Sequence, residues 1–443
     1  MWASTYGTAE GTVAVHPTRE VCTSVIRIAL AYVWLTIATG GVVFSEPAPY
    51  DALMIGAVLL LPVVGLTRFD RGIALYLSLW VLIVAGGYIA TTQAGILDVP
   101  ATHVTVTLYL ALSSVVMAAF VLDRPEPNVR LIMSAYLFAA LVAACAGLIG
   151  YFNLLPGARD LFAPEFGRLR GTFKDPNVLG AFLVPALLYV LNRVIRQGAL
   201  RASLWILAAP VLLFGTLLTF SRGAWLNLAV ALAAYACFTF VTMSTHRQRL
   251  KLILYVVLAG TFSVGILAAA LTIPTVADMM GERAKLEQSY DVGPEGRFGG
   301  QRKAADLVLD HPLGIGALEF QRVYHHEDVH EVYLNMYLNT GWVGGTAYVA
   351  LMLLTLGLGL RQVVRDRGGT GLSAVLVAAF IGIALEGAVV DTDHWRHFYL
   401  IMAMIWGMAL AGRDVHYPTY SDRRSLSDSL ISHFGSATAP RTS

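Results

Sequence analysis

One arginine lies in a turn between two apolar stretches of the chain. Arg222 belongs to the sequence TFSRG at 219–223. A charged side chain this close to hydrocarbon is costly, by about 2.5–3.5 kcal/mol at a helix centre and less near its edge. The guanidinium could reach lipid headgroups, or it could form two parallel hydrogen bonds with phosphate oxygens. Position alone leaves both interpretations open.

A second cationic stretch, RGTFKDPN at 170–177, contains Arg170 and Lys174 and runs into another apolar stretch. A helix N-terminus suits an anion, so this stretch could hold phosphate. An ordinary turn, with Asp175 or Asn177 capping the following helix, explains the same residues. Taken alone, the stretch favours the ordinary turn.

The polar segment 274–342 combines an arginine with several histidines. Arg297 follows a glycine, and HHEDVHEVYL at 325–334 includes His330 and Glu331. Histidine has a pKa near neutrality, which suits general base catalysis. For any single histidine the alternative is a solvated polar loop.

Residues 326–330, HEDVH, also fit the H-E-x-x-H pattern of zinc proteases. Catalytic zinc needs a third protein ligand, and no clear partner motif follows, although Asp391, Asp393, His394 and His397 could be invoked. Asp328 would also make the local helix polar. We therefore predict no metal and no cofactor.

The composition indicates a membrane protein. Hydrophobic residues make up 56% of the 443 residues and charged residues 14%, and the mean hydropathy is +0.64. So few charges could not cover a soluble protein of this size. The net charge of +2 suggests no nucleic-acid partner, and the three distant cysteines form no metal or redox motif. Residues 1–20 lack the pattern of a removable signal peptide.

We expect an all-α, polytopic integral membrane protein with about 12 transmembrane helices. The apolar stretches are 22–43, 51–67, 73–92, 103–122, 130–152, 177–195, 203–220, 224–243, 252–273, 343–360, 371–390 and 397–411. Basic residues gather in alternate connecting loops and in the tail, whereas the loops 44–50 and 93–102 hold none. Both termini are therefore expected in the cytoplasm.

This topology divides the chain into five regions. We predict a cytoplasmic N-terminus at 1–21, nine transmembrane helices within 22–273, and a periplasmic catalytic loop at 274–342. Three further transmembrane helices follow within 343–411, and a disordered cytoplasmic tail covers 412–443. Within the long loop we expect a helix at 297–310, a glycine-rich turn at 314–316 and a helix from about 330 into Gly341.

Together, these pieces resemble the O-antigen ligase and O-antigen polymerase superfamily of bacterial membrane glycosyltransferases. RGTFKDPN at 170–177 is similar to the family's R-G-T-F-x-x-P-N motif, and TFSRG at 219–223 to its T-x-S-R-G turn. The stretch from Arg297 to Leu334 resembles the family's long periplasmic loop. The first five helices match only in hydropathy. Family members commonly carry His-Asn where this chain has His330 and Glu331, so either residue could be the base.

The resemblance implies a GT-C-like fold in the bacterial inner membrane and a role in lipopolysaccharide biosynthesis. Arg222 and Arg297 would grip the diphosphate of an undecaprenyl-diphosphate-linked glycan, and Arg170 and Lys174 would be secondary phosphate contacts. His330 would deprotonate the acceptor, with inversion at the anomeric carbon and without a metal.

Three functions remain open from the sequence. A ligase would move the glycan to the lipid A-core oligosaccharide, and a polymerase would use the same donor to extend an O-antigen or exopolysaccharide. A transporter or flippase is the third, but it would place charges along a midplane path. Polar residues inside the apolar stretches are sparse, and Arg27 and Glu386 are the main ones.

Overall fold

The computed structural model describes residues 23–164, 167–197, 203–243, 245–272, 277–278, 281, 293, 296–366 and 369–411. Every regular element among these residues is a helix, so the predicted all-α class is confirmed for this part of the chain. The predicted N-terminal region 1–21, the tail 412–443 and most of 274–295 lie outside the described residues.

Each of the twelve predicted apolar stretches forms a helix. These helices are α1 (Thr23–Ala38), α2 (Pro49–Val64), α3 (Arg71–Thr91), α4 (Asp98–Asp123), α5 (Pro125–Tyr151), α7 (Pro176–Gln197), α8 (Ser203–Leu218), α9 (Arg222–Thr242), α10 (His246–Ala270), α13 (Val332–Arg365), α14 (Leu372–Glu386) and α15 (Arg396–Ala411). Among the described residues, seven helical segments are long and apolar enough to cross a membrane. A polytopic membrane fold fits, and the number of twelve spans stays a prediction.

The described part of the long polar segment follows the expected order of elements. Helix α12 (Arg297–Asp310) coincides with the predicted 297–310. The helix expected from about 330 begins at Val332, and Gly341 interrupts α13 with a φ of 68°. A side chain at Gly341 would meet the carbonyl oxygen of Pro312 at 2.8 Å, so this close crossing requires glycine.

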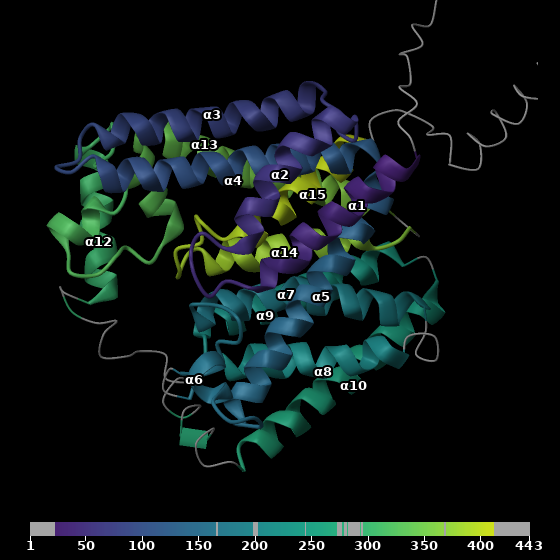
Figure 1. Ribbon diagram of the computed structural model, residues 1–443. Helices are drawn as coiled ribbons and strands as arrows, with labels where there is room; N and C mark the ends of the chain where they lie inside the picture. Colours follow the sequence, from purple (N-terminus) through teal and green to yellow (C-terminus); the bar gives the residue numbers. More distant parts are fainter. Residues whose placement is uncertain are drawn as a thin grey trace, which may run out of the picture.

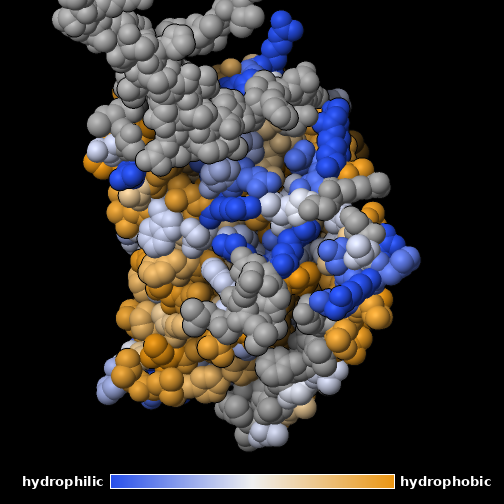
Figure 2. All heavy atoms as spheres, turned by 90° about the vertical axis from the view of Figure 1, so that its right-hand side faces the viewer, coloured by the Kyte–Doolittle hydropathy of each residue, from blue (hydrophilic) through white to orange (hydrophobic). Residues whose placement is uncertain are grey.

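The helices form one bundle with α14 near its middle. Figure 1 shows α3, α4 and α13 along one side of the bundle, and α5, α7, α8 and α9 along the other. Helix α14 packs against α7, α9, α13 and α15, and α12 lies at one end of the bundle. Figure 2 looks onto the opposite end, where hydrophilic side chains gather between hydrophobic ones. Polar elements and side chains therefore lie at both ends of an apolar bundle.

Candidate active site

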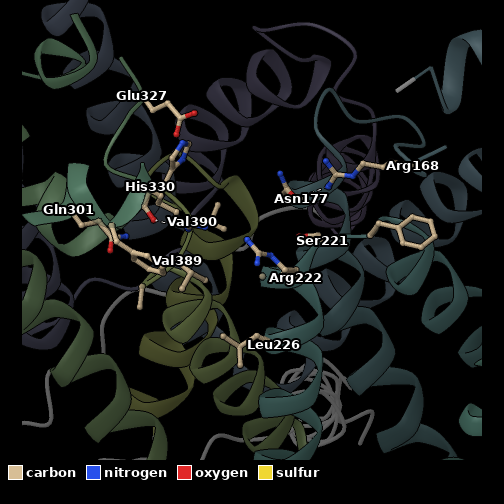
Figure 3. Close-up of a pocket in the computed structure, with 15 residues that line it drawn as sticks. Arg168, Asn177, Ser221, Arg222, Leu226, Gln301, Glu327, His330, Val389 and Val390 are labelled. Carbon is tan, nitrogen blue, oxygen red and sulfur yellow. Dashed lines mark hydrogen bonds between the residues drawn. The ribbon is translucent and has the colours of Figure 1, made fainter. Parts of the chain in front are cut away.

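A cavity of about 480 Å³ lies between the start of α12, the start of α9 and the segment that follows α14. Asn177, in the first turn of α7, also lines it. Its volume falls within the range of about 300–1,000 Å³ that is typical of ligand pockets. Figure 3 shows Arg222 and Arg168 on one wall and His330 and Gln301 on the other.

A tight turn between α8 and α9 positions Arg222 on the cavity wall. Phe220 adopts a φ of 50°, a rare left-handed conformation for a bulky residue. The hydroxyl of Ser221 then caps α9 by accepting a hydrogen bond from the amide of Ala224 at 3.2 Å. A side chain at Gly223 would meet Oε1 of buried Glu386 at 2.9 Å. The TFSRG sequence thus fixes the backbone position from which the Arg222 side chain extends.

A second arginine on the same wall is Arg168. Its Nε donates a hydrogen bond to the carbonyl oxygen of Thr219 at 2.9 Å, and its Nη2 donates to Oδ1 of Asn177 at 2.8 Å. The amide of Leu169 also donates to the carbonyl oxygen of Leu218 at 2.8 Å. The segment around Arg168 is therefore tied to the turn that carries Arg222, and both cations face one cavity.

The third arginine comes from the opposite wall. Arg297 is the first residue of α12, and its Nη2 donates a hydrogen bond to the carbonyl oxygen of His330 at 3.3 Å. One turn along α12, Gly300 leaves room for the ring of His325, whose atoms would lie 3.2–3.4 Å from an added Cβ. The start of α12 is thus packed directly on the histidine-rich segment.

His330 is held at the cavity between two anchored neighbours. Val329 is fully buried in a small cluster with Ala304 and Phe320. The amide of Val332 donates to the carbonyl oxygen of Gly387 at 2.8 Å. His330 itself has a φ of 51°, so its backbone is strained by about 1–3 kcal/mol. Such strain persists only where surrounding contacts impose it.

The environment of His330 favours its neutral form. Burial lowers the pKa of its imidazole, and the Arg297 guanidinium lowers it further, while Asp328 and Glu327 act in the opposite direction. A neutral imidazole can accept a proton at neutral pH, which a general base requires. Glu327 lines the same cavity, and Figure 3 shows it beside His330.

Glu331, the other candidate for the base, lies at the start of α13. Its carboxylate caps α13 by accepting hydrogen bonds from the amides of Tyr333 at 3.1 Å and Leu334 at 2.7 Å. Burial raises its pKa, although these backbone bonds oppose the rise. Glu331 is not among the residues that line the cavity. Of the two candidates for the base, His330 lines the cavity and Glu331 caps the next helix, and the choice between them stays a prediction.

The two predicted secondary phosphate contacts are not among the residues that line the cavity. Arg170 donates from Nη2 to the carbonyl oxygen of Leu161 at 3.0 Å. Lys174 lies 3.7 Å from a carboxylate oxygen of Glu46 and is exposed. Oδ1 of Asp175 accepts from the amide of Asn177 at 2.7 Å, so the capping turn is what this stretch forms.

Sequence reasoning did not select five polar residues of the cavity, namely Arg168, Asn177, Ser221, Gln301 and Glu327. Arg168 precedes Arg170 by two residues, and nothing in the local sequence indicates which of them faces the turn before α9. Gln301 lies one helical turn after Arg297. The i, i+4 spacing from Arg297 on the predicted helix 297–310 indicates that Gln301 lies on the same helix face.

The zinc-protease interpretation loses its geometric basis. Residues 326–330 are not helical, so the i, i+4 spacing does not place both imidazoles on one helix face. A different group, His103, Asp393 and His394, has ligand atoms within 4.8 Å of one another. Nε2 of His103 lies 2.9 Å from Oδ2 of Asp393. This group could hold a metal ion, but none of its members lines the cavity that holds His330.

The comparison with protein families gives one match. Residues 202–349 match a family described as O-antigen ligase. This range includes Arg222, Arg297 and His330, whereas Arg168 precedes it. A search among curated proteins found no match.

Proposed function

Since the chain belongs to the O-antigen ligase and polymerase superfamily of multi-pass bacterial membrane glycosyltransferases, we propose that it transfers a glycan from undecaprenyl diphosphate to an acceptor hydroxyl. One observation carries the proposal. Arg222, Arg297 and His330 come from three separate segments and line one cavity. The cavity thus combines fixed cations for a diphosphate with a neutral base for a hydroxyl.

The arginines suit a diphosphate leaving group. Negative charge grows on the diphosphate as its bond to the sugar breaks, and fixed guanidinium groups stabilise that charge without reorganising. Arg222 and Arg297 approach from opposite walls, and Arg168 supplies a third cation. We therefore assign the secondary phosphate contact to Arg168 in place of Arg170 and Lys174. Apolar Leu226 and Phe298 at the same cavity are exposed and suit a polyprenyl chain.

The proposed step balances without a metal ion. His330 takes the proton from the acceptor hydroxyl, and the hydroxyl oxygen forms a bond to the anomeric carbon. The bond from that carbon to the diphosphate oxygen breaks on the opposite face, so configuration inverts. Undecaprenyl diphosphate leaves with the electron pair, facing the arginines. Glu331 contributes by capping α13, directly after the base.

The proposal puts the cavity at the periplasmic face of the inner membrane, with both termini in the cytoplasm. The basic residues of the alternate loops support this orientation. We take the lipid A-core oligosaccharide as the acceptor, which makes the protein a ligase. A polymerase would use the same cavity and differ only in the acceptor.

Gel analysis of lipopolysaccharide from a strain that lacks the gene tests the assignment. Loss of all long chains, restored by the wild-type gene and not by His330→Ala, supports a ligase. Retention of core plus one repeat unit indicates a polymerase instead. Glycan export that continues in an Arg222→Ala/Arg297→Ala double variant would favour a transporter and overturn the enzyme proposal.

A further inference from the structure

A second cavity, of about 250 Å³, lies at the other end of α7. Arg193 and Arg196, from the last turns of α7, line it together with Arg130 of α5. Asn177 at the start of α7 lines the first cavity, and the helix has 22 residues. Such a helix is about 33 Å long, close to the ~30 Å hydrocarbon layer. The two cavities therefore lie at opposite membrane surfaces.

Arg193 has aromatic neighbours and no described carboxylate partner. Its Cζ lies 5.5 Å from the centre of the Tyr189 ring and 5.3 Å from that of Trp205. Its Nε is buried and makes no hydrogen bond to any described residue. Aromatic faces stabilise a guanidinium but leave its N–H groups unsatisfied. The aromatic rings therefore position the Arg193 guanidinium, and its Nε–H can still donate a hydrogen bond to a ligand.

The other two arginines are fixed at the rim of this cavity. Nε of Arg196 donates to Oδ1 of Asn192 at 3.2 Å, and its Nη1 donates to the carbonyl oxygen of Gly369. Arg130 pairs with Glu126 at 3.1 Å. Among the described residues, Glu126 and Asp366 are the acidic groups beside the cavity, and neither lines it. Three guanidinium groups against two carboxylates leave an excess of positive charge.

We propose that this arginine cavity binds the phosphate group of an anionic phospholipid such as phosphatidylglycerol. Guanidinium groups recognise phosphate oxygens with paired hydrogen bonds, and basic pockets between helices at a membrane surface suit acidic headgroups. Inorganic phosphate shares this chemistry, but the surroundings favour a lipid. Ile206 and Leu207, which follow Trp205 on α8, are exposed apolar residues at the same end of the bundle. They offer a surface for an acyl chain below the headgroup.

Native mass spectrometry of the full-length protein in detergent tests the proposal. The probes are dioctanoyl phosphatidylglycerol, the neutral dioctanoyl phosphatidylcholine, and inorganic phosphate as competitor. We expect one phosphatidylglycerol per chain, and an Arg193→Gln/Arg196→Gln variant should bind it about tenfold or more weakly. Arg193→Lys retains the charge and should bind more tightly than the double variant. Arg361→Gln, an exposed arginine of α13 outside this cavity, is the matched control and should bind like wild type.

Three results would overturn the proposal. They are equal affinity of the wild type for the two lipids, unchanged phosphatidylglycerol binding by the double variant, and displacement of the lipid by equimolar phosphate. A double variant that elutes as an aggregate is replaced by Arg193→Gln alone, to which the same criteria apply. None of these results depends on glycan transfer, because the cavity lies apart from Arg222, Arg297 and His330.

Discussion

Nη2 of Arg297 donates a hydrogen bond to the carbonyl oxygen of His330 across 3.3 Å. The bond joins the first residue of α12 to the segment immediately before α13. It links the proposed base to one of the proposed phosphate-binding cations, so a change in one affects the position of the other. His330 also has a left-handed backbone, with a φ of 51°. We interpret the strained backbone and the bond as parts of one preorganised site.

Arg222→Ala and Arg297→Ala should each reduce glycan transfer by about 10²–10³-fold, the usual effect of removing one donor to a developing anion. Cell-surface glycan measured by gel, with immunoblots of membrane fractions, checks this prediction. Membrane levels should stay normal because both guanidinium groups line an open cavity. Arg302→Ala provides the control, since Arg302 is an exposed residue of α12, the helix that begins with Arg297, and does not line the cavity. Near-normal transfer by Arg297→Ala would count heavily against the proposal that Arg222 and Arg297 bind the diphosphate.

His330 and Glu331 should differ clearly when each is replaced. His330→Ala should abolish transfer, because no other imidazole among the described residues lines the cavity. Glu331→Asn should keep most of the activity, since asparagine caps helices well but cannot act as a base. Complementation of the deletion strain at matched membrane levels compares the two. An inactive Glu331→Asn protein at normal levels would make Glu331 the base.

The pH dependence of transfer should report the ionisation of His330. Burial and Arg297 hold its pKa below the ordinary value of 6.5, and the base acts when neutral. Activity should therefore be full above that pKa and fall as the pH drops through it. Glu327 raises the His330 pKa, so Glu327→Gln should shift the acid limb of kcat/KM to lower pH. A shift to higher pH would contradict the placement of Glu327.

Gly223→Ala should damage the turn that positions Arg222. The new methyl group would lie 2.9 Å from Oε1 of Glu386, a fully buried carboxylate whose Oε2 accepts a hydrogen bond from Nδ2 of Asn227 at 2.8 Å. Overpacking of this kind costs about 1–3 kcal/mol, so both transfer and thermal stability should fall. Gly357→Ala in α13 is the control, because its added methyl group meets nothing within 4 Å. Equal melting temperatures for the two variants would show that the crowding at Gly223 is tolerated.

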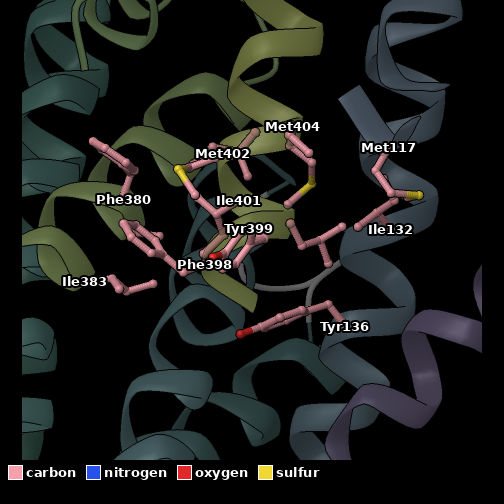
Figure 4. Close-up of a cluster of buried hydrophobic side chains, with 14 of the residues drawn as sticks. Met117, Ile132, Tyr136, Phe380, Ile383, Phe398, Tyr399, Ile401, Met402 and Met404 are labelled. Atoms are coloured by element: carbon pink, nitrogen blue, oxygen red, sulfur yellow. The ribbon is translucent and has the colours of Figure 1, made fainter. Parts of the chain in front are cut away.

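The helices could be predicted because each carries an apolar stretch, but their packing could not. In Figure 4, Met117 of α4, Tyr136 of α5 and Phe398 of α15 meet in one buried cluster. Their separation along the chain leaves no local signal. Within a membrane helix, hydropathy is high on every face and therefore does not show which face meets another helix.

The site shows the same limit. Arg222 was selected from its turn between two apolar stretches, and Arg297 from the resemblance of its segment to the family's long loop. Arg168 and Arg170 share one such break, and only the contact of Arg168 with Thr219 distinguishes them. His330 and Glu331 are adjacent in the sequence. Only the structure shows that the amide of Leu334 in α13 donates a hydrogen bond to the Glu331 carboxylate. Choices of this kind depend on three-dimensional neighbours, which the local sequence does not show.

Chelation should leave transfer intact. The proposed step uses guanidinium groups and an imidazole, so treatment with EDTA should not change the initial rate. The same measurement tests whether a metal ion at the group formed by His103, Asp393 and His394 is needed for transfer. Loss of activity that zinc restores would revive the metal interpretation and direct attention to that group.

The most direct test is in vitro transfer by purified protein. The initial rate is measured with an undecaprenyl-diphosphate-linked glycan and lipid A-core oligosaccharide, for the wild type and for Arg222→Ala/Arg297→Ala/His330→Ala. We predict transfer by the wild type, and no product above background from the triple variant at equal folded concentration. Transfer by the triple variant within a few-fold of the wild-type rate would contradict the assignment of this cavity as the active site.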